Sequence, residues 1–233
     1  MNTQAHLMIA AAIFCRPNTG ARTSAFRASV RNAAILLGAI VADISLVLMW
    51  ASAKLRGIDE KIIWEELYYS DYWQNIGAMT NSIPLYMLLT LLGLTFIGAS
   101  GFRQAMGDAS TNPNQRTGGS SANLTKTITP ALAIPLLLFA AAALLHCLSD
   151  LPLHAGDGHP HFWPFTLWIY SSPVSYWDPE HFGLYWLVIE FLIVLWCVIV
   201  LFRRYPSMWV KGCLLLPLLA YPVVYGYWMW SLA

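Results

Sequence analysis

The chain has 233 residues, of which 58% are hydrophobic and only 11% are charged, and it contains eleven tryptophans. Soluble domains carry about 25% charged residues, so this composition excludes an ordinary soluble protein and indicates an integral membrane protein. The net charge of +1 is uninformative as a total. The basic residues are few and are spread over three short loops, so nothing resembles a nucleic-acid-binding surface.

Six apolar runs predict transmembrane helices. In chain order they are a short run at residues 5–15 and longer runs at 32–50, 83–99, 128–146, 184–202 and 208–232. We therefore expect an all-α, polytopic membrane helix bundle of about six transmembrane helices, the first one short. The whole chain, 1–233, is expected to form a single integral-membrane domain.

The basic residues predict the orientation of these helices. Ten of the thirteen lie in three connecting segments: Arg16, Arg22, Arg27 and Arg31; Arg103, Arg116 and Lys126; Arg203, Arg204 and Lys211. The positive-inside rule places these segments in the cytoplasm, including a flexible loop at 101–127 that is rich in Gly, Ser, Thr and Asn. The acidic segments 51–82 and 149–183, and both termini, then face the periplasm of a bacterial cell, across its inner membrane.

This topology places all six histidines at the outer ends of the helices. His6 begins the first helix, His146 closes the fourth, and the remaining four lie in the outer histidine-rich loop, 149–183. Asp43, within the second apolar run, lies about 10 Å below the outer surface at about 1.5 Å per residue. Imidazoles and carboxylates are therefore expected to meet on one side of the membrane.

The sequence ALLHCLSDLPLH places His146 and Asp150 four residues apart, so that one helix face presents both side chains. Pro152 ends the helix at about Asp150 or Leu151 and allows His154 to turn back toward the same point. The spacing suits two metal ligands, or one ligand and the carboxylate that orients it. The alternative is a polar pair that only seals the helix end.

Two carboxylates lie within apolar runs. Asp43 must face the protein interior, where the remaining partners are a histidine, a metal ion or its own proton, or else an Asn or Ser on a neighbouring helix. Glu190, in the fifth run, is either an acid that supports the site or a structural group that shares a proton.

The segment HAGDGHPHFWPF contains three histidines and an aspartate. His159 and His161 alternate around Pro160, so in an extended segment their side chains point to opposite faces and at most one joins a given metal, with Asp157 or His154 as companion. The alternative is that these histidines are solvated. The aromatic string FWPFTLWIY is typical of a membrane-interface belt or of a lining for an acyl chain.

The four cysteines stand singly, which argues against a disulfide framework or a thiolate zinc site. No GxSxG, P-loop or HExxH motif is present in the sequence, so a serine hydrolase or an ATPase has no support. The remaining ligand set of imidazoles and carboxylates suits zinc, or iron or manganese where carboxylates dominate.

An ordered set of short motifs resembles a known family. NTxxH (residues 2–6), an aspartate in ADI (42–44) and LHxxxD (145–150) followed by a WP dipeptide (163–164) are similar to the LexA-binding, inner-membrane-associated family of metal-dependent hydrolases. The resemblance covers most of the chain up to about Pro164. It implies an integral-membrane hydrolase whose metal ligands are His6, Asp43, His146 and Asp150.

The chain also departs from the pattern of that family. ADIS stands where the family has PDxDH, and only Asn81 and Ser82 remain of HRGxTHS. The group of His154, Asp157, His159 and His161 is additional, so it either substitutes for the missing ligands or marks a divergent subgroup without the chemistry. The full layout is also similar to small bacterial membrane proteins labelled as cobalamin biosynthesis proteins, a label that no residue here supports.

These patterns lead to two functional hypotheses. The first is a membrane-embedded metal-dependent hydrolase that acts on a lipid or amphipathic ester, amide or phosphodiester, with zinc as the expected divalent metal and Asp157 or Asp71 as proton acceptor. The second is a non-enzymatic membrane protein that binds or delivers a metal ion, or is a subunit of a larger complex. The expected metal ligands are His6, Asp43, His146, Asp150, His154 and one of His159 or His161.

Overall fold

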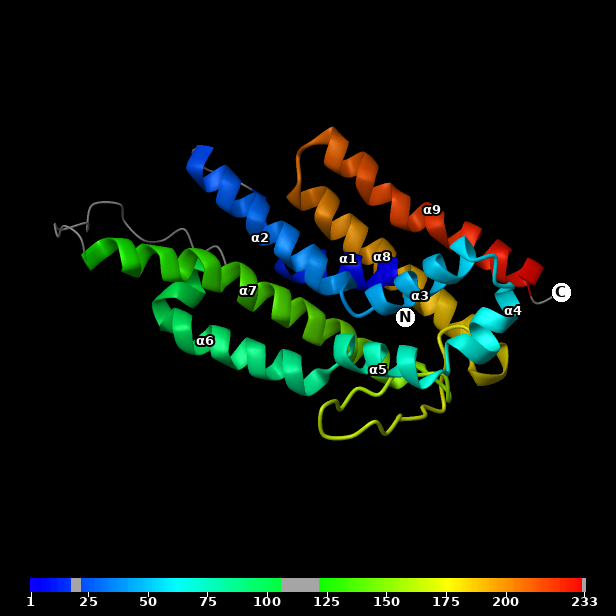
Figure 1. Ribbon diagram of the computed structural model, residues 1–233. Coiled ribbons are helices and arrows are strands. Elements are labelled where there is room, and N and C mark those ends of the chain that lie inside the picture. The colour runs from blue at the N-terminus through cyan, green and yellow to red at the C-terminus, as the bar shows by residue number, and fades with distance from the viewer. Residues whose placement is uncertain (18–21, 106–121, 232–233) are drawn as a thin grey trace.

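The structure is a computed structural model that describes residues 1–17, 22–105 and 122–231 (Figure 1). These residues form helices joined by turns and loops, with no strand among them, which confirms the all-α prediction. The elements, in chain order, are α1 (Thr3–Phe14), α2 (Arg22–Ile40), α3 (Ile44–Leu55), α4 (Glu60–Ile62), the π-helical turn η1 (Ile63–Leu67), α5 (Asp71–Thr80), α6 (Ile83–Ala105), α7 (Ala122–Asp150), the 3₁₀ turns η3 (Leu151–Leu153) and η4 (Pro179–His181), α8 (Gly183–Arg204) and α9 (Met208–Ser231).

Three described segments are long and apolar enough to cross a membrane, namely Asp71–Ile97, Ala133–Leu153 and Gly183–Arg204. A bent pair, Ala25–Ile40 with Ile44–Leu55, makes a fourth if it counts as one span. These lengths and compositions are those of a membrane protein. α1 has only 12 residues, in line with the short first helix expected from the sequence.

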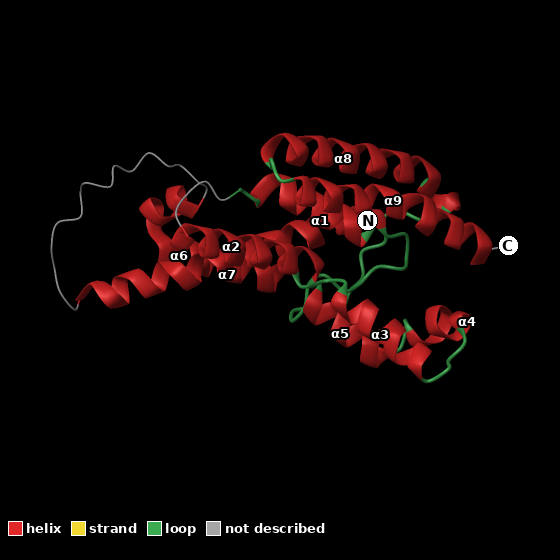
Figure 2. Cartoon of the chain, turned by 90° about the horizontal axis from the view of Figure 1, so that it is seen from above, coloured by secondary structure: helices red, strands yellow, loops and turns green. Residues whose placement is uncertain are grey.

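α7 is the central helix of the bundle. It packs against α2 on one side and α6 on the other, while α1 packs against α2 and α8, and α8 packs against α9 (Figure 1). The backbones of α2 and α7 approach closely at Gly38, where an added Cβ would lie 2.2 Å from the Phe139 carbonyl oxygen. Small residues permit such contacts between membrane helices. Figure 2 shows α3, α4 and α5 as a smaller group beside one end of the long helices.

The second apolar run is not one continuous helix, which corrects the prediction for residues 32–50. It breaks between Ile40 and Ile44, where the chain bends by 67°. The break frees backbone carbonyl groups, and polar side chains of α5 and of the residue after it satisfy one of them: Thr80 Oγ1 and Asn81 Nδ2 each donate to the Ala42 oxygen over 3.2 Å. A break at membrane depth is tolerated only with such internal partners. Asp43 therefore lies in a turn, not in a helix.

The helices also extend further into the expected loop 101–127 than the sequence predicts. α6 continues to Ala105 and α7 begins at Ala122, so both ends of the expected loop are helical. Ser, Thr and Asn cost less than about 0.7 kcal/mol each in a helix, so a polar composition alone does not end one. Residues 106–121, the rest of that loop, lie outside the described residues.

The two ends of the bundle differ in charge. At one end Arg204 donates to the carbonyl oxygens of Ala12 and Cys15, both over 2.7 Å, and Arg31 donates to that of Arg16 over 2.9 Å. The first and fifth connecting segments therefore meet, as their basic residues predict. The start of α1, the end of α7 and the start of α8 lie at the opposite end, toward which the end of α9 also points (Figure 1).

Candidate metal centre

The last turn of α7 carries the first two residues of the site. His146 and Asp150 lie four residues apart and both are buried, with 1% and 5% of their surface exposed. α7 ends at Asp150, and Pro152 stands in the following 3₁₀ turn, which confirms the helix end predicted from that proline. The local sequence thus places an imidazole and a carboxylate on one helix face.

The break between α2 and α3 determines the tautomer of His146. The backbone NH of Asp43 bonds to the Ile40 oxygen, so the Ala39 oxygen lacks its usual helical partner. His146 Nδ1 lies 2.6 Å from this Ala39 oxygen. A carbonyl oxygen only accepts, so Nδ1 carries the hydrogen and, in the neutral ring, Nε2 keeps a bare lone pair.

Ser149 fixes the ring of His6 in the same way. The Ser149 hydroxyl donates to the His146 carbonyl oxygen over 3.0 Å, and its oxygen lies 3.2 Å from His6 Nδ1. In the tautomer in which His6 Nδ1 donates to Ser149, His6 Nε2 keeps a bare lone pair. His6 is 3% exposed.

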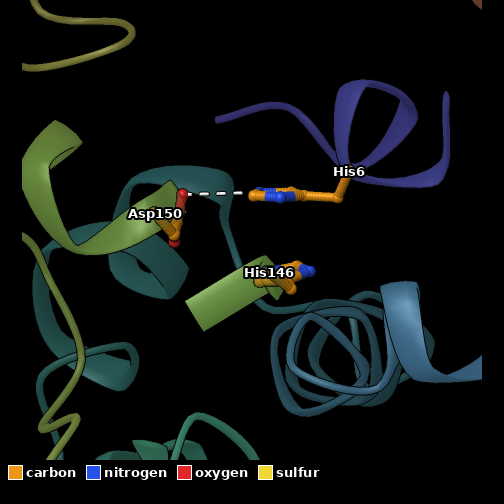
Figure 3. A group of neighbouring side chains, drawn as sticks. All are labelled: His6, His146 and Asp150. Carbon is orange, nitrogen blue, oxygen red and sulfur yellow. Dashed lines mark ion pairs between the residues drawn. The ribbon is translucent and has the colours of Figure 1, made fainter. Parts of the chain in front are cut away.

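The two imidazole rings meet face to face. Their centroids are 3.5 Å apart and their planes differ by 13°. Neither Nε2 atom has a hydrogen-bond partner among the described residues, although both are buried. Figure 3 shows His6 reaching from α1 toward Asp150, with His146 from α7 beside it. Two buried lone pairs without a donor mark a place where a cation would be stabilised.

Carboxylate oxygens lie beside both lone pairs. His6 Nε2 is 3.5 Å from Asp150 Oδ1, and His146 Nε2 is 3.5 Å from Asp43 Oδ1. Two ligands of one tetrahedral zinc ion lie about 3.4 Å apart when each bond is about 2.1 Å long. One ligand atom each from His6, His146 and Asp150 lie within 4.8 Å of one another. The donor set and its spacing therefore fit a divalent metal ion.

Asp43 joins the site from the turn between α2 and α3. The Thr3 hydroxyl donates to Asp43 Oδ2 over 2.6 Å, which directs Oδ1 toward His146. The sequence expectation that Asp43 needs a histidine, a metal or a proton agrees with this position beside an imidazole. Asp43 is thus the fourth residue and the second carboxylate of the site, and it is oriented by Thr3, the first residue of α1.

Asp150 is surrounded by positive or hydrogen-donating groups. The Met1 amino group donates to Oδ1, and His154 Nε2 lies 2.9 Å from Oδ2. Both oxygens of this buried carboxylate are therefore in polar contacts. Its Oδ1 faces the amino group and His6 together, so this oxygen is the one shared between the N-terminal segment and the candidate metal centre.

His154 lies between two carboxylates. Its Nε2 contacts Asp150, and its Nδ1 lies 3.3 Å from Asp157 Oδ1. Burial disfavours the charged form, but the charge of Asp150 and the hydrogen bonds to Asp150 and Asp157 outweigh it and raise the pKa of His154 to about 9. As it stands, His154 is a cation that links two acids.

Asp157 is held ionised by its neighbours. Burial opposes its charge, but the hydrogen bond and charge of His154, together with a hydrogen bond from Trp177 Nε1, keep the pKa of Asp157 below its usual value. The Tyr68 hydroxyl donates to its backbone oxygen over 2.5 Å. A carboxylate with a lowered pKa is a weak proton acceptor at neutral pH.

His159 and His161 lie next to this group. His159 packs against the Tyr68 ring, with centroids 5.5 Å apart, and against Gly77, where an added Cβ would lie 2.8 Å from His159 Nδ1. His159 Nδ1 and His161 Nε2 are buried and find no hydrogen-bond partner in the described part of the chain. Burial, with the neighbouring charge of His154, lowers the pKa of His159 to about 4, and burial likewise lowers that of His161 to about 4.

Three further predicted residues lie in other surroundings. Asp71 is exposed in the first turn of α5. His181, the sixth histidine, pairs with Asp178 over 2.6 Å at the turn before α8. Glu190 is fully buried and accepts hydrogen bonds from the Asn2 side chain and the Tyr221 hydroxyl, both over 2.8 Å.

Sequence reasoning missed the groups that orient the ligands. These are the Ala39 carbonyl oxygen, the Ser149 hydroxyl and the Thr3 hydroxyl. Ser149 follows His146 by three residues on the same helix, a spacing that could have indicated it. Nothing in the residue pattern indicates the Ala39 oxygen, because every residue has a backbone carbonyl.

No protein-family model, curated protein or solved structure matches the chain. The resemblance to the inner-membrane metal-dependent hydrolases therefore stays a prediction. The chemistry of the site rests on its own residues and their geometry.

Proposed function

We propose that the protein is a membrane-embedded, metal-dependent hydrolase with a His/Asp metal centre. His6, His146 and Asp150 hold the ion, and Asp43 completes its surroundings. Zinc is the metal that a mixed set of imidazoles and carboxylates favours. His154, Asp157, His159 and His161 form the polar wall beside this centre.

The observation that carries the proposal is the pair of bare, buried Nε2 atoms of His6 and His146. Each has its Nδ1 hydrogen bound to an oxygen acceptor, and each Nε2 lies 3.5 Å from a carboxylate oxygen. Metal-binding histidines have this arrangement, in which the second ring nitrogen donates to a fixed acceptor. A buried imidazole that only seals a helix end would use both nitrogens in hydrogen bonds.

A divalent ion at this position would polarise a carbonyl or phosphoryl group and make water a nucleophile near neutral pH. The residues of the chain bind and orient: Ala39, Ser149 and Thr3 hold His146, His6 and Asp43 in place. His154 neutralises the second oxygen of Asp150, and Asp157 in turn supports the charge of His154.

We place the site on the periplasmic side of a bacterial inner membrane, with about six membrane helices and both termini outside. The arginine-rich end, where Arg31 and Arg204 bind backbone oxygens, would then be cytoplasmic. A periplasm-active reporter fused after Ala233 should be active. Reporter activity that appears only with a cytoplasmic enzyme at this position would contradict the orientation.

Metal analysis of the protein purified in mild detergent without chelator tests the centre itself. Wild type should retain about one zinc ion per chain, and His146→Ala and Asp43→Ala should lose it while remaining folded. A matched control, His181→Ala, removes a histidine outside the site and should retain the metal. If wild type holds no metal and all the variants are as stable as wild type, the cluster is not a metal centre and its polar residues only close the helix ends.

A second candidate function, metal binding without catalysis, is favoured by the burial of the three ligands. His6, His146 and Asp150 are all at most 5% exposed, and closed sites are typical of structural or storage metals. Hydrolysis of a chromogenic long-chain ester or phosphodiester separates the two functions. If the protein is a hydrolase, His146→Ala should lack this activity. Wild type should lose the activity when its metal is removed by a chelator and regain it when zinc is added back.

A further inference from the structure

An apolar groove of about 360 Å³ lies at the outer end of α8. It is lined by Pro152 and Leu153 of η3, by Val174 of the loop, by Phe182 just before α8, and by Trp186 and Ile189 of α8. Its volume lies in the range of small-molecule sites. Phe182 and Ile189 are exposed, whereas Leu153 is buried, so the groove opens away from the protein core.

The groove and the metal centre share a wall. That wall is η3, which follows Asp150 directly and precedes His154 directly. The loop holds it in place, because the Ser172 hydroxyl donates to the Pro152 oxygen over 2.6 Å and the Tyr176 backbone NH donates to the Leu153 oxygen over 3.0 Å. A molecule lying in the groove would therefore pass within one short turn of the candidate metal ligand Asp150.

Trp186, one of the residues that line the groove, has a side-chain NH without a partner in the described part of the chain. Trp186 Nε1 is buried, and no described residue accepts its hydrogen. A buried indole NH normally finds an acceptor, so this one indicates a ligand oxygen. Trp186 precedes Glu190 by four residues on the same face of α8, and Glu190 binds Asn2 at the start of α1. Trp186 thus lies on the side of α8 that also carries Glu190.

Phe182 has an unusual backbone at the edge of the groove. Its φ of 67° is in the left-handed region, where a bulky residue is strained, and its apolar side chain is exposed. The strain is kept at a position that lines the groove and begins the membrane-crossing helix α8. Strained residues of this kind cluster at ligand sites.

We propose that this groove binds one acyl chain of a membrane phospholipid, with the Trp186 NH donating to the ester carbonyl group. The occupant follows from continuity with the exposed apolar surface of α8: Tyr185 and Ile189 line the groove and are exposed, as are Leu184, Val188 and Leu192 of the same helix. An aromatic residue at the outer end of a membrane helix belongs at the depth of the ester groups. That the bound lipid is also the hydrolysed substrate rests on the proposed function.

Photolabelling tests the groove directly. The probe is phosphatidylethanolamine with a diazirine in one acyl chain, added below one molecule per protein in detergent, and labelled peptides are mapped by mass spectrometry. Label should concentrate on residues 151–153 and 182–189. Unlabelled phosphatidylethanolamine should compete for this label, and glycerophosphoethanolamine, which lacks acyl chains, should leave it unchanged.

Ile189→Trp fills the groove and should reduce labelling about tenfold. The matched control is Leu192→Trp, which adds the same bulk one turn further along the exposed surface of α8 and should leave labelling unchanged. Trp186→Phe keeps the aromatic ring and removes the NH, so labelling should fall about threefold to tenfold. Equal labelling of wild type and Ile189→Trp, or an equal loss in Leu192→Trp, would overturn the proposal.

The zinc content of the same preparations separates the two proposals. Ile189→Trp should retain the wild-type amount of zinc, because no metal ligand is changed. If wild type holds no zinc but is labelled selectively at the groove, the acyl-chain proposal is supported and the hydrolase proposal is contradicted. If wild type holds its full zinc content but the label is spread evenly over the lipid-facing helices, the metal centre is supported and the acyl-chain proposal is contradicted.

Discussion

Two kinds of histidine contact the carboxylates of the candidate metal centre, and they differ in what their nitrogens face. His6 and His146 belong to helices, and each directs Nδ1 to an oxygen acceptor and leaves Nε2 bare. His154 belongs to the loop after α7, and both of its nitrogens face carboxylates. The helix-borne pair is prepared to bind a cation, whereas the loop histidine is itself the cation.

This difference shows that proximity alone does not make a histidine a ligand. His154 Nε2 lies 2.9 Å from Asp150 Oδ2, close to the candidate metal centre. The two neighbouring carboxylates raise the pKa of His154 to about 9. Near neutral pH its ring therefore carries a proton on the nitrogen that would otherwise bind a metal ion. His6 and His146 direct Nδ1 to a hydroxyl and a backbone oxygen, and each Nε2 lies 3.5 Å from a single carboxylate oxygen. His154 differs from them in that its Nδ1 also faces a carboxylate, Asp157, over 3.3 Å.

The largest effect is expected where the two groups meet, at Asp150. Asp150→Ala removes a ligand oxygen and leaves the His154 charge buried without its main partner. Zinc content should fall below about a tenth of wild type, and the free energy of unfolding should fall by about 3 to 5 kcal/mol. Asp157→Ala removes the carboxylate beside His154 Nδ1 and the acceptor of Trp177 Nε1 but no proposed ligand, so it should retain zinc. If Asp150→Ala holds as much zinc as wild type, Asp150 is not a ligand of the metal.

A smaller and more specific effect is expected when one histidine of each group is changed. Chelator competition should show that His146→Gln weakens zinc binding at least about a thousandfold, because a direct ligand is lost. His154→Gln should weaken it only about 10-fold to 100-fold, the usual cost of removing a partner of a ligand. Equal losses in both variants would mean that His154 binds the metal directly and that the two groups are one.

The smallest effect is a dependence of stability on pH in the chelated protein. The pKa of His154 is raised to about 9 in the fold, from about 6.5 in the unfolded chain. Its stabilisation is therefore complete below about pH 6.5 and is lost as the pH rises through about 9. The difference in unfolding free energy between wild type and His154→Gln should fall by about 3 kcal/mol across this window. A difference that stays constant from pH 6 to pH 10 would show that His154 is uncharged.

Part of the site was predictable from local spacing. A histidine and an aspartate four residues apart must share a helix face, and Pro152 must end that helix close to Asp150, because a proline disfavours helical geometry in the residue before it. The pattern of basic residues predicts that the first and fifth connecting segments lie on one side of the membrane, and in the structure these two segments meet at one end of the bundle. These features depend on residues that are near each other in the chain or on charge alone.

The bend at residues 41–43 was not predictable in this way. Val41, Ala42 and Asp43 continue an apolar run, and hydropathy does not distinguish a helix from a turn whose carbonyl groups are satisfied by Thr80 and Asn81. Those donors come from the region of α5, 38 and 39 residues away in the sequence. Packing between distant segments therefore determined where the second run breaks.

The bend in turn determined which histidine nitrogens are free. It exposes the Ala39 oxygen to His146, which is 107 residues away along the chain. It also places Asp43 beside the ring of His146. Composition and spacing identify a membrane helix bundle with histidines and aspartates at one end. The orientation of each imidazole depends on backbone carbonyl groups, which every residue type carries alike and which only the folded chain brings into reach.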